Sequence, residues 1–154
     1  MQEGRELFPL MTVEENLDIG AYSARARARR HETKERVFAL LARLRERRGQ
    51  LAHATSGGEQ RMCAIGRGLT ACPEMLLLDE PSLGLAPVII QTVYEKLREI
   101  NAAGTTILLV EQNLKAALKV AHRAYALEGG RVVLSGASAA LVDDPRLLAA
   151  YLGR

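Results

Sequence analysis

Residues 75–79, with the sequence MLLLD, form a short apolar run that ends in a carboxylate and is followed by Glu80 and Pro81. A run of this length and composition predicts a buried strand, and Pro81 has no N–H group with which to continue a hydrogen-bond ladder. We therefore expect Asp79 and Glu80 to lie at the carboxyl end of this strand, which is the edge of an open α/β sheet where ligands bind. The alternative is a strand end that is acidic without having a function.

From residue 73 onward, short apolar runs alternate with helical patterns, which is typical of an α/β sheet domain. The further elements predicted there are a helix over 88–102 that ends at Gly104, a strand over 105–110, a helix that begins after Asn113, a hairpin over 123–136 that turns at Gly129 and Gly130, and two short helices separated at residues 144 and 145. We therefore expect residues 73–154 to form part of an α/β core.

Residues 1–72 carry helical patterns instead. Three helices are predicted there: a short one that opens with a capping box at residues 12–15, a single helix over 31–47, and a helix that follows Ser56 and ends near Ala71. The sequence therefore predicts two domains, a helical one over 1–72 and an α/β one over 73–154.

The composition is that of an ordinary soluble globular protein, with 48% hydrophobic and 25% charged residues in a chain of 154. No run approaches the roughly 18 apolar residues of a membrane-spanning helix. The first residues, MQEGRELFPL, lack the apolar stretch of a signal peptide, so we expect a cytoplasmic protein. Cys63 and Cys72 form no C-x-x-C pair and are expected to be buried free thiols, and the three histidines are too scattered for a metal cluster.

Arginines are concentrated in two stretches, SARARARRHETK (residues 23–34) and RLRERRGQ (residues 43–50). Such runs form either a solvated helix face or a surface that meets anionic lipid head groups or an acidic partner. With 4% aromatic residues and no tryptophan, the chain lacks the stacking platform of a single-strand nucleic-acid binder. We therefore expect no nucleic acid among its partners.

A second motif, TSGGEQ, occupies residues 55–60. Ser56 and Glu59 have the spacing of a capping box, which makes Ser56 the predicted N-cap of the following helix. Gly57 and Gly58 then fall in the first helical turn, where each costs roughly 1 kcal/mol relative to alanine. Glycines at this place leave backbone N–H groups open to an anion at the positive end of the helix dipole. The motif therefore predicts a phosphate seat, although an S-G-G segment also occurs in ordinary capped helices.

Together, the two motifs resemble those of the ATP-binding-cassette (ABC) ATPases. Residues 56–60 match the signature motif, with Thr55 in place of the usual leucine and Glu59 in place of the usual glutamine. Residues 75–79 match the Walker B strand, Glu80 the acid that follows it, and residues 82–85 the D-loop. Five ordered segments, EGRELFP-x-MTVEENL, SGGEQ, DEPSLGLAP, ILLVEQN and LEGGRVVLSG, are similar to the ATPase subunits of bacterial branched-chain amino acid uptake systems, the LivF type.

The resemblance implies a P-loop NTPase fold that binds ATP and Mg²⁺, with a helical signature subdomain and an α/β core. In this family Asp79 would hold Mg²⁺, and Glu80 would be the general base that deprotonates the attacking water. Gln112 stands in the place of the switch histidine and Glu3 in the place of the Q-loop glutamine.

The resemblance also implies partners. Ser56, Gly57, Gly58 and Glu59 would contact the γ-phosphate of a nucleotide held by an opposite subunit, so the family works as a homo- or heterodimer of ATPase subunits. The dimer would bind transmembrane permease subunits at the cytoplasmic face of the inner membrane, and a periplasmic solute-binding protein would take part indirectly. The helical portion would meet the permease.

No G-x-x-x-x-G-K-[ST] segment, the Walker A loop, occurs among the 154 residues. Family members carry this loop in the first third of the chain, so the resemblance implies a partial fold in which the N-terminal strands and the Walker A loop are missing. A truncated gene, a fragmentary gene prediction and a mis-set start are the alternatives. We expect the 154-residue chain to bind Mg-ATP weakly or not at all, and its sheet to expose an apolar edge that favours aggregation.

Two other functions are compatible with these motifs. One is a non-catalytic remnant that binds only a partner. The other is a DNA-maintenance ATPase of the same superfamily, which would carry long heptad coiled coils upstream of the signature motif; no heptad pattern extends beyond the short arginine-rich helix.

Overall fold

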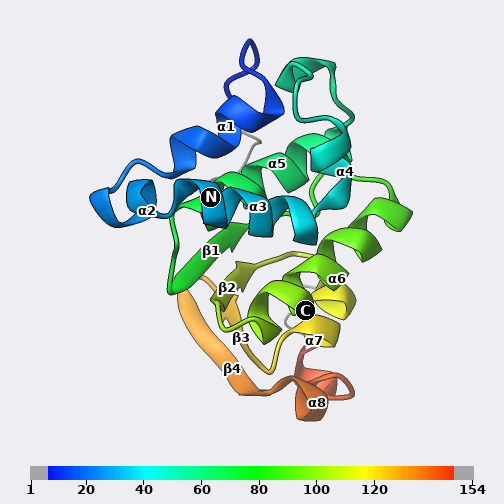
Figure 1. The fold of residues 1–154 in the computed structure, drawn as a ribbon. Coiled ribbons are helices and arrows are strands. Elements are labelled where there is room, and N and C mark those ends of the chain that lie inside the picture. The colour runs from blue at the N-terminus through cyan, green and yellow to red at the C-terminus, as the bar shows by residue number, and fades with distance from the viewer. Residues whose placement is uncertain (1–6, 148–154) are drawn as a thin grey trace. The chain divides into compact units, whose positions relative to one another are not determined.

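The computed structural model describes residues 7–147, and Figure 1 shows their helices and strands. The chain divides into two compact units, Met1–Val110 and Glu111–Arg154. The first unit contains α1 (Val13–Gly20), α2 (Ala24–Ala28), α3 (Arg30–Leu40), α4 (Ala42–Glu46), a short 3-10 helix η1 (Ala52–Ala54), α5 (Gly57–Thr70), β1 (Met75–Asp79), α6 (Pro87–Ala102) and β2 (Thr106–Val110). The second contains α7 (Leu114–Val120), β3 (Arg123–Glu128), β4 (Arg131–Ala137) and α8 (Ser138–Leu141). The predicted domain boundary at residue 72 lies within the first unit and stays a prediction.

Helices α1, α3, α4 and α5 surround one apolar core. Its buried members are Val13, Leu17, Val37, Phe38, Leu41, Leu44 and Cys63. The predicted capping box at the start of α1 is confirmed, because the Thr12 side chain accepts from the Glu15 N–H while the Glu15 carboxylate accepts from the Thr12 N–H at 2.7 Å. Burial of these side chains, more than helix propensity, stabilises helices as short as these.

The prediction of a single helix over residues 31–47 is wrong. Helix α3 ends at Leu40, and Leu41 leaves the helical region with φ −116° and ψ 63° before α4 begins. Leu41 and Leu44, 4% and 0% exposed, both lie in the core. Because residues three apart share one face of an unbroken helix too, the apolar spacing does not reveal the break. A further short helix, α2, was not predicted; it starts where the Ser23 side chain accepts from the Ala26 N–H.

The sheet of the first unit is a parallel pair, β1 and β2, connected through α6, as the alternation of strand and helix predicts. The register places Asp79 beside Val110, and the Glu80 N–H continues the ladder by donating to the Val110 carbonyl at 2.9 Å. Both strand predictions are therefore confirmed, and Asp79 ends β1 as expected.

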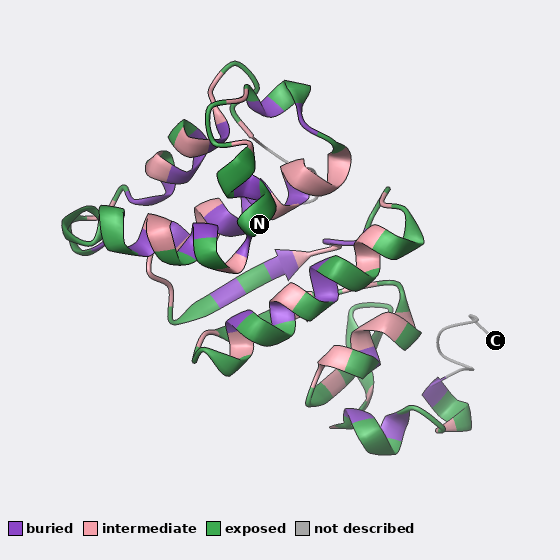
Figure 2. Cartoon of the chain, turned by 45° about the vertical axis from the view of Figure 1, so that its right-hand side comes forward, coloured by how far each residue is buried: buried purple, intermediate pink, exposed green. Residues whose placement is uncertain are grey.

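One face of this pair is apolar and exposed. Burial alternates along β1, with Leu76 and Leu78 buried and with Met75 and Leu77 50% and 53% exposed (Figure 2). The prediction of a wholly buried strand is therefore wrong, because within the described residues only alternate side chains of β1 are covered. The exposed row continues onto β2, where Leu108 lies beside Leu77 in the register and is 51% exposed. The sequence predicts an exposed apolar edge of the sheet, whereas the apolar surface seen here is one face of β1 and β2, so the predicted edge stays a prediction.

The second unit contains the predicted hairpin of β3 and β4. Its turn is made by Gly129 and Gly130, whose φ values of 54° and 75° are those of a two-residue hairpin turn that favours glycine. Asn113 caps α7 as predicted, since its side chain accepts from the Ala116 N–H at 3.2 Å. Of the two predicted terminal helices, the first is α8, and residues 145–147 begin the second.

Cys63 is fully buried and Cys72 half-buried, and both are free thiols. Burial raises the pKa of Cys63 to about 12, so its thiol is protonated at neutral pH and inert. Among residues 7–147, no helix is long and apolar enough to cross a membrane.

Candidate functional site

The first turn of α5 has the predicted capping geometry. Ser56 is the N-cap, with φ −64° and ψ 159°; its side chain accepts from the Glu59 N–H at 3.3 Å, and its own N–H donates to the Glu59 carboxylate at 2.8 Å. Gly57 and Gly58 follow in the first turn, both half-buried. A Cβ at Gly58 would lie 2.7 Å from Ile89 Cγ2 of α6, so close packing also requires a glycine there. Bare N–H groups at a helix N-terminus fit an anion.

The carboxylates after β1 lie in a constrained turn. Glu80 has φ +42°, an uncommon conformation for a residue other than glycine, which costs on the order of 1–3 kcal/mol. Its N–H is held by Val110, its carbonyl accepts from the Leu83 N–H at 3.1 Å, and Pro81 is fully buried. Asp79 and Glu80 remain half-exposed. A conformation that costs free energy but is held from several sides is typical of a functional site.

Arg61 connects the two motifs within the first unit. This side chain of α5 is only 2% exposed, and its Nη2 donates to the Leu83 carbonyl at 3.4 Å in the loop that follows β1. A buried guanidinium is stable only when it is hydrogen-bonded, so this contact fixes the loop relative to α5. The sequence reasoning missed Arg61. The available signal was its position four residues before Ile65, on the buried face of the helix.

The predicted site residues therefore form separate groups. Ser56, Gly57, Gly58 and Glu59 share one helical turn, and Asp79 and Glu80 share one strand end. Gln112 is exposed, belongs to the second unit and follows β2 by two residues in the chain. Glu3 lies outside the described residues.

Glu59 brings a negative charge to the N-terminus of α5. Its burial would by itself raise its pKa, but hydrogen bonds with Ser56 and the positive charges of Arg47 and Arg43 outweigh that effect and hold the pKa below its usual value. Glu59 is therefore ionised at neutral pH, beside the N–H groups of Gly57 and Gly58.

In the part of the chain that the structure describes, no three His, Cys, Asp or Glu side chains are grouped to hold a metal ion. A single carboxylate such as Asp79 still fits Mg²⁺, because this ion is commonly bound by one or two carboxylates together with substrate phosphates and water. The residues present are thus compatible with Mg²⁺ only where phosphate is also bound.

A protein-family model described as an ABC transporter matches residues 1–83. The high-affinity branched-chain amino acid transport ATP-binding protein BraG of Pseudomonas aeruginosa is 49% identical over 151 residues, which are 98% of this chain and 64% of BraG. The probable branched-chain amino acid transport ATP-binding protein LivF of Archaeoglobus fulgidus is 35% identical over 144 residues, 91% of this chain and 59% of that protein.

Solved structures show the same fold. This chain superposes on the crystal structure of the ADP conformation of MJ1267, an ATP-binding cassette of an ABC transporter, with a TM-score of 0.81 and 26% sequence identity. The alignment covers 99% of this chain and 66% of MJ1267. The chain thus spans about two thirds or less of the length of these relatives, between 59% and 66%.

Proposed function

The chain belongs to the ABC transporter family, and from this premise we propose that it is part of the ATPase subunit that powers branched-chain amino acid import across the inner membrane. Branched-chain amino acids are proposed as the solute because almost the whole chain is similar to BraG. The capped, glycine-opened turn of α5 and the two carboxylates after β1 are the features of this chain that suit a triphosphate.

Each site residue has a role in this proposal. Asp79 would help to hold Mg²⁺, which would neutralise phosphate charge, and Glu80 would accept the proton of the attacking water as general base. Gln112 contacts the γ-phosphate from its place after β2, and Glu3 takes the place of the Q-loop residue. The strained backbone of Glu80 supports its role, because it fixes the carboxylate at the strand end.

The proposed phosphate seat acts across a dimer interface. The N–H groups of Gly57 and Gly58, with Ser56, bind the γ-phosphate of a nucleotide whose remaining contacts come from a facing ATPase subunit, in a homo- or heterodimer. Glu59 takes part by capping the turn that presents these N–H groups. The dimer binds permease subunits at the cytoplasmic face of the membrane, and the periplasmic solute-binding protein acts through them.

The second candidate, a non-catalytic remnant that binds only a partner, stays an alternative to this proposal. The DNA-maintenance alternative is disfavoured, since among the described residues the longest helix upstream of the signature motif is α3 with 11 residues, far short of a heptad coiled coil.

An uptake assay tests the proposed function. A bacterial strain that lacks its LivF-type gene would receive the chain extended by the Walker A-containing segment of BraG, and uptake of labelled leucine and glutamate would be measured. We expect leucine uptake to return while glutamate uptake stays unchanged. If leucine uptake does not return although the extended subunit co-purifies with the permease and hydrolyses ATP, the solute assignment is wrong.

We also expect the 154-residue chain alone to bind Mg-ATP weakly and not to hydrolyse it, because it lacks the amide cradle and the lysine that hold the phosphates. Isothermal titration compares it with the extended version, for which micromolar binding is expected. Micromolar affinity of the 154-residue chain would contradict the prediction, because these residues would then suffice to bind the nucleotide.

A further inference from the structure

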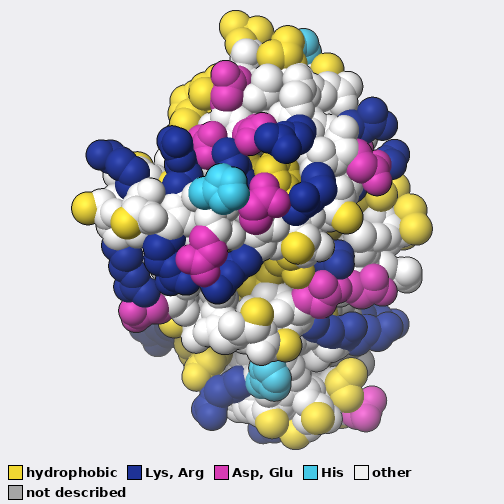
Figure 3. All heavy atoms as spheres, viewed as in Figure 1, with side chains coloured by type: hydrophobic (Ala, Val, Ile, Leu, Met, Phe, Trp, Pro, Cys, Tyr) yellow, Lys and Arg dark blue, Asp and Glu magenta, His cyan; other side chains and the backbone are white. Residues whose placement is uncertain are grey.

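The arginine-rich stretches of this chain are used mainly within the protein. On the face seen in Figure 3, basic and acidic side chains lie side by side over the helical part. Ion pairs of the two stretches include Arg25 with Glu74, Arg29 with Glu32, Arg30 with Asp18, Arg45 with Glu35, and Arg48 with Glu14. Most of these side chains are exposed, where an ion pair contributes little to stability.

Two arginines of the second stretch differ from the others, because they meet at Glu59. Arg43 Nε lies 3.4 Å from Glu59 Oε1, and Arg47 Nε lies 3.5 Å from the same oxygen. The Glu59 side chain is only 15% exposed, and the Arg47 Nε atom is buried and has no hydrogen-bond partner among the described residues. Both contacts join α4 and the residue that caps it to the first turn of α5.

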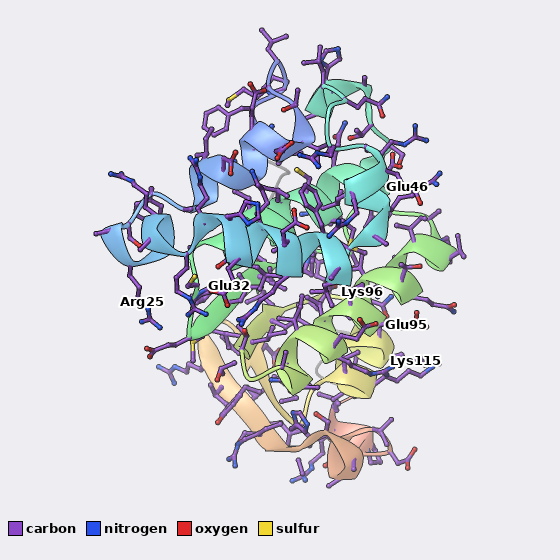
Figure 4. The ribbon with its side chains drawn as sticks, viewed as in Figure 1. Arg25, Glu32, Glu46, Glu95, Lys96 and Lys115 are labelled. Carbon is purple, nitrogen blue, oxygen red and sulfur yellow. The ribbon has the colours of Figure 1, made fainter. Side chains whose placement is uncertain are left out.

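The surroundings of Glu59 make its charge costly. The carboxylate borders an apolar pocket of about 460 Å³ between α3, α4, α5 and α6, to which Leu41, Leu44 and Met62 contribute. Lys96 of α6 lines the same pocket but is paired with Glu99 at 2.9 Å, and Arg43 also pairs with Glu46 at 2.6 Å (Glu46 and Lys96 are labelled in Figure 4). Arg43 and Arg47 are thus the cations whose ion pairs reach Glu59.

A carboxylate at this place acts in two opposite ways. It caps α5 by accepting from the Ser56 N–H, which holds the turn that presents the N–H groups of Gly57 and Gly58. Its negative charge, however, repels an anion that approaches the same N–H groups. A glutamine would keep a hydrogen-bond acceptor without this repulsion, and glutamine is the usual residue here in the family that the sequence resembles.

We propose that Arg43 and Arg47 are positioning residues that neutralise Glu59 and hold its carboxylate on the Ser56 N–H, so that the first turn of α5 accepts a phosphate although it carries an acid. The inference rests on the proposed phosphate seat and deepens it. It gives the second arginine-rich stretch a function within the subunit, in place of contact with lipid or an acidic partner.

Nuclear magnetic resonance on the 154-residue chain tests the proposal with two readouts. The first is the pH titration of the Glu59 carboxyl group, and the second is the response of the Gly57 and Gly58 amide signals to inorganic phosphate. The variants are Arg43→Gln with Arg47→Gln, and the same pair with Glu59→Gln added. The matched control is Arg45→Gln with Arg48→Gln. It removes two positive charges from the same stretch, but these arginines pair with Glu35 and Glu14 and not with Glu59.

We expect the Arg43→Gln, Arg47→Gln variant to raise the pKa of Glu59 toward its usual value and to bind phosphate about fivefold more weakly than the control. Adding Glu59→Gln should restore phosphate binding to that of the control, because no charge is then left to neutralise. A loss of packing would not be reversed in this way, and the Arg45→Gln, Arg48→Gln control accounts for the loss of general positive charge.

Two outcomes would overturn the proposal: a Glu59 pKa that is the same in the double variant as in the control, or a triple variant that binds phosphate as weakly as the double variant. If the Gly57 and Gly58 signals of the unsubstituted chain do not respond to phosphate, the proposed seat is wrong. The titration of Glu59 then decides separately whether the two arginines hold its carboxylate.

Discussion

Replacement of Glu80 by glutamine is expected to lower the rate of ATP hydrolysis about 10²- to 10⁴-fold, the range for loss of a general base, in the chain extended by the Walker A-containing segment of BraG. Glutamine has nearly the same size and tolerates the φ of +42° no worse than glutamate, so the turn after β1 should keep its shape. Its amide cannot accept the proton of the attacking water. Affinity for Mg-ATP should be retained, because glutamine keeps the size of the side chain and removes a negative charge that repels the phosphates.

The measurements are phosphate release under ATP saturation and equilibrium ATP binding. Glu74→Gln is the matched control, because Glu74 precedes β1, is exposed, and forms an ion pair with Arg25 at 3.6 Å. This control should hydrolyse ATP at the unmodified rate. Unchanged hydrolysis by Glu80→Gln would remove Glu80 from the reaction, whereas loss of both binding and hydrolysis would mean that Glu80 holds the nucleotide instead.

The parts of the site that depend on local interactions were predictable from the sequence. The capping box of α5 needs only Ser56 and Glu59 at the right spacing, and its hydrogen bonds lie within four residues. The same holds for the Asn113 cap and for the glycine turn of the hairpin, where φ values above zero select glycine. Strand β1 was predictable because its apolar run is bounded by Pro81.

Features that depend on distant contacts were not predictable. The burial of Arg61 depends on the Leu83 carbonyl, 22 residues away. The φ of Glu80 is set by the neighbouring strand through Val110. In each case a tertiary contact decides against the local preference.

The pairing of Arg43 and Arg47 with Glu59 belongs to the same class. The sequence shows an arginine-rich stretch and an acid in the signature motif, but their meeting depends on how α4 packs on α5. The half-exposed state of β1 is different: it depends on what covers its second face, where Met75 and Leu77 lie open among the described residues. The sequence of a strand shows which side chains are apolar, but not whether another element packs against them.

The contact between α1 and α5 gives the largest expected effect on stability. Gly20 is the last residue of α1, and a Cβ built there would lie 2.0 Å from the Arg67 carbonyl oxygen and 2.1 Å from Thr70 Oγ1. The Thr70 hydroxyl is itself buried and hydrogen-bonds the Leu17 carbonyl at 2.7 Å, which ties the two helices together. Gly20→Ala therefore forces the helices apart and breaks this bond, and we expect it to lower the free energy of unfolding by about 3 kcal/mol.

Gly49→Ala is the matched control, because a Cβ at Gly49 meets nothing within 4 Å. Its effect on the free energy of unfolding should stay within about 0.5 kcal/mol. Urea denaturation followed by circular dichroism measures both variants against the unsubstituted chain. Because α5 also carries the Ser56–Gly58 turn, the loss in Gly20→Ala should be accompanied by faster hydrogen exchange of the α5 amides. Equal unfolding midpoints for the two variants would show that α1 and α5 do not pack this closely in solution, and would leave the first turn of α5 without the support on which the proposed phosphate seat depends.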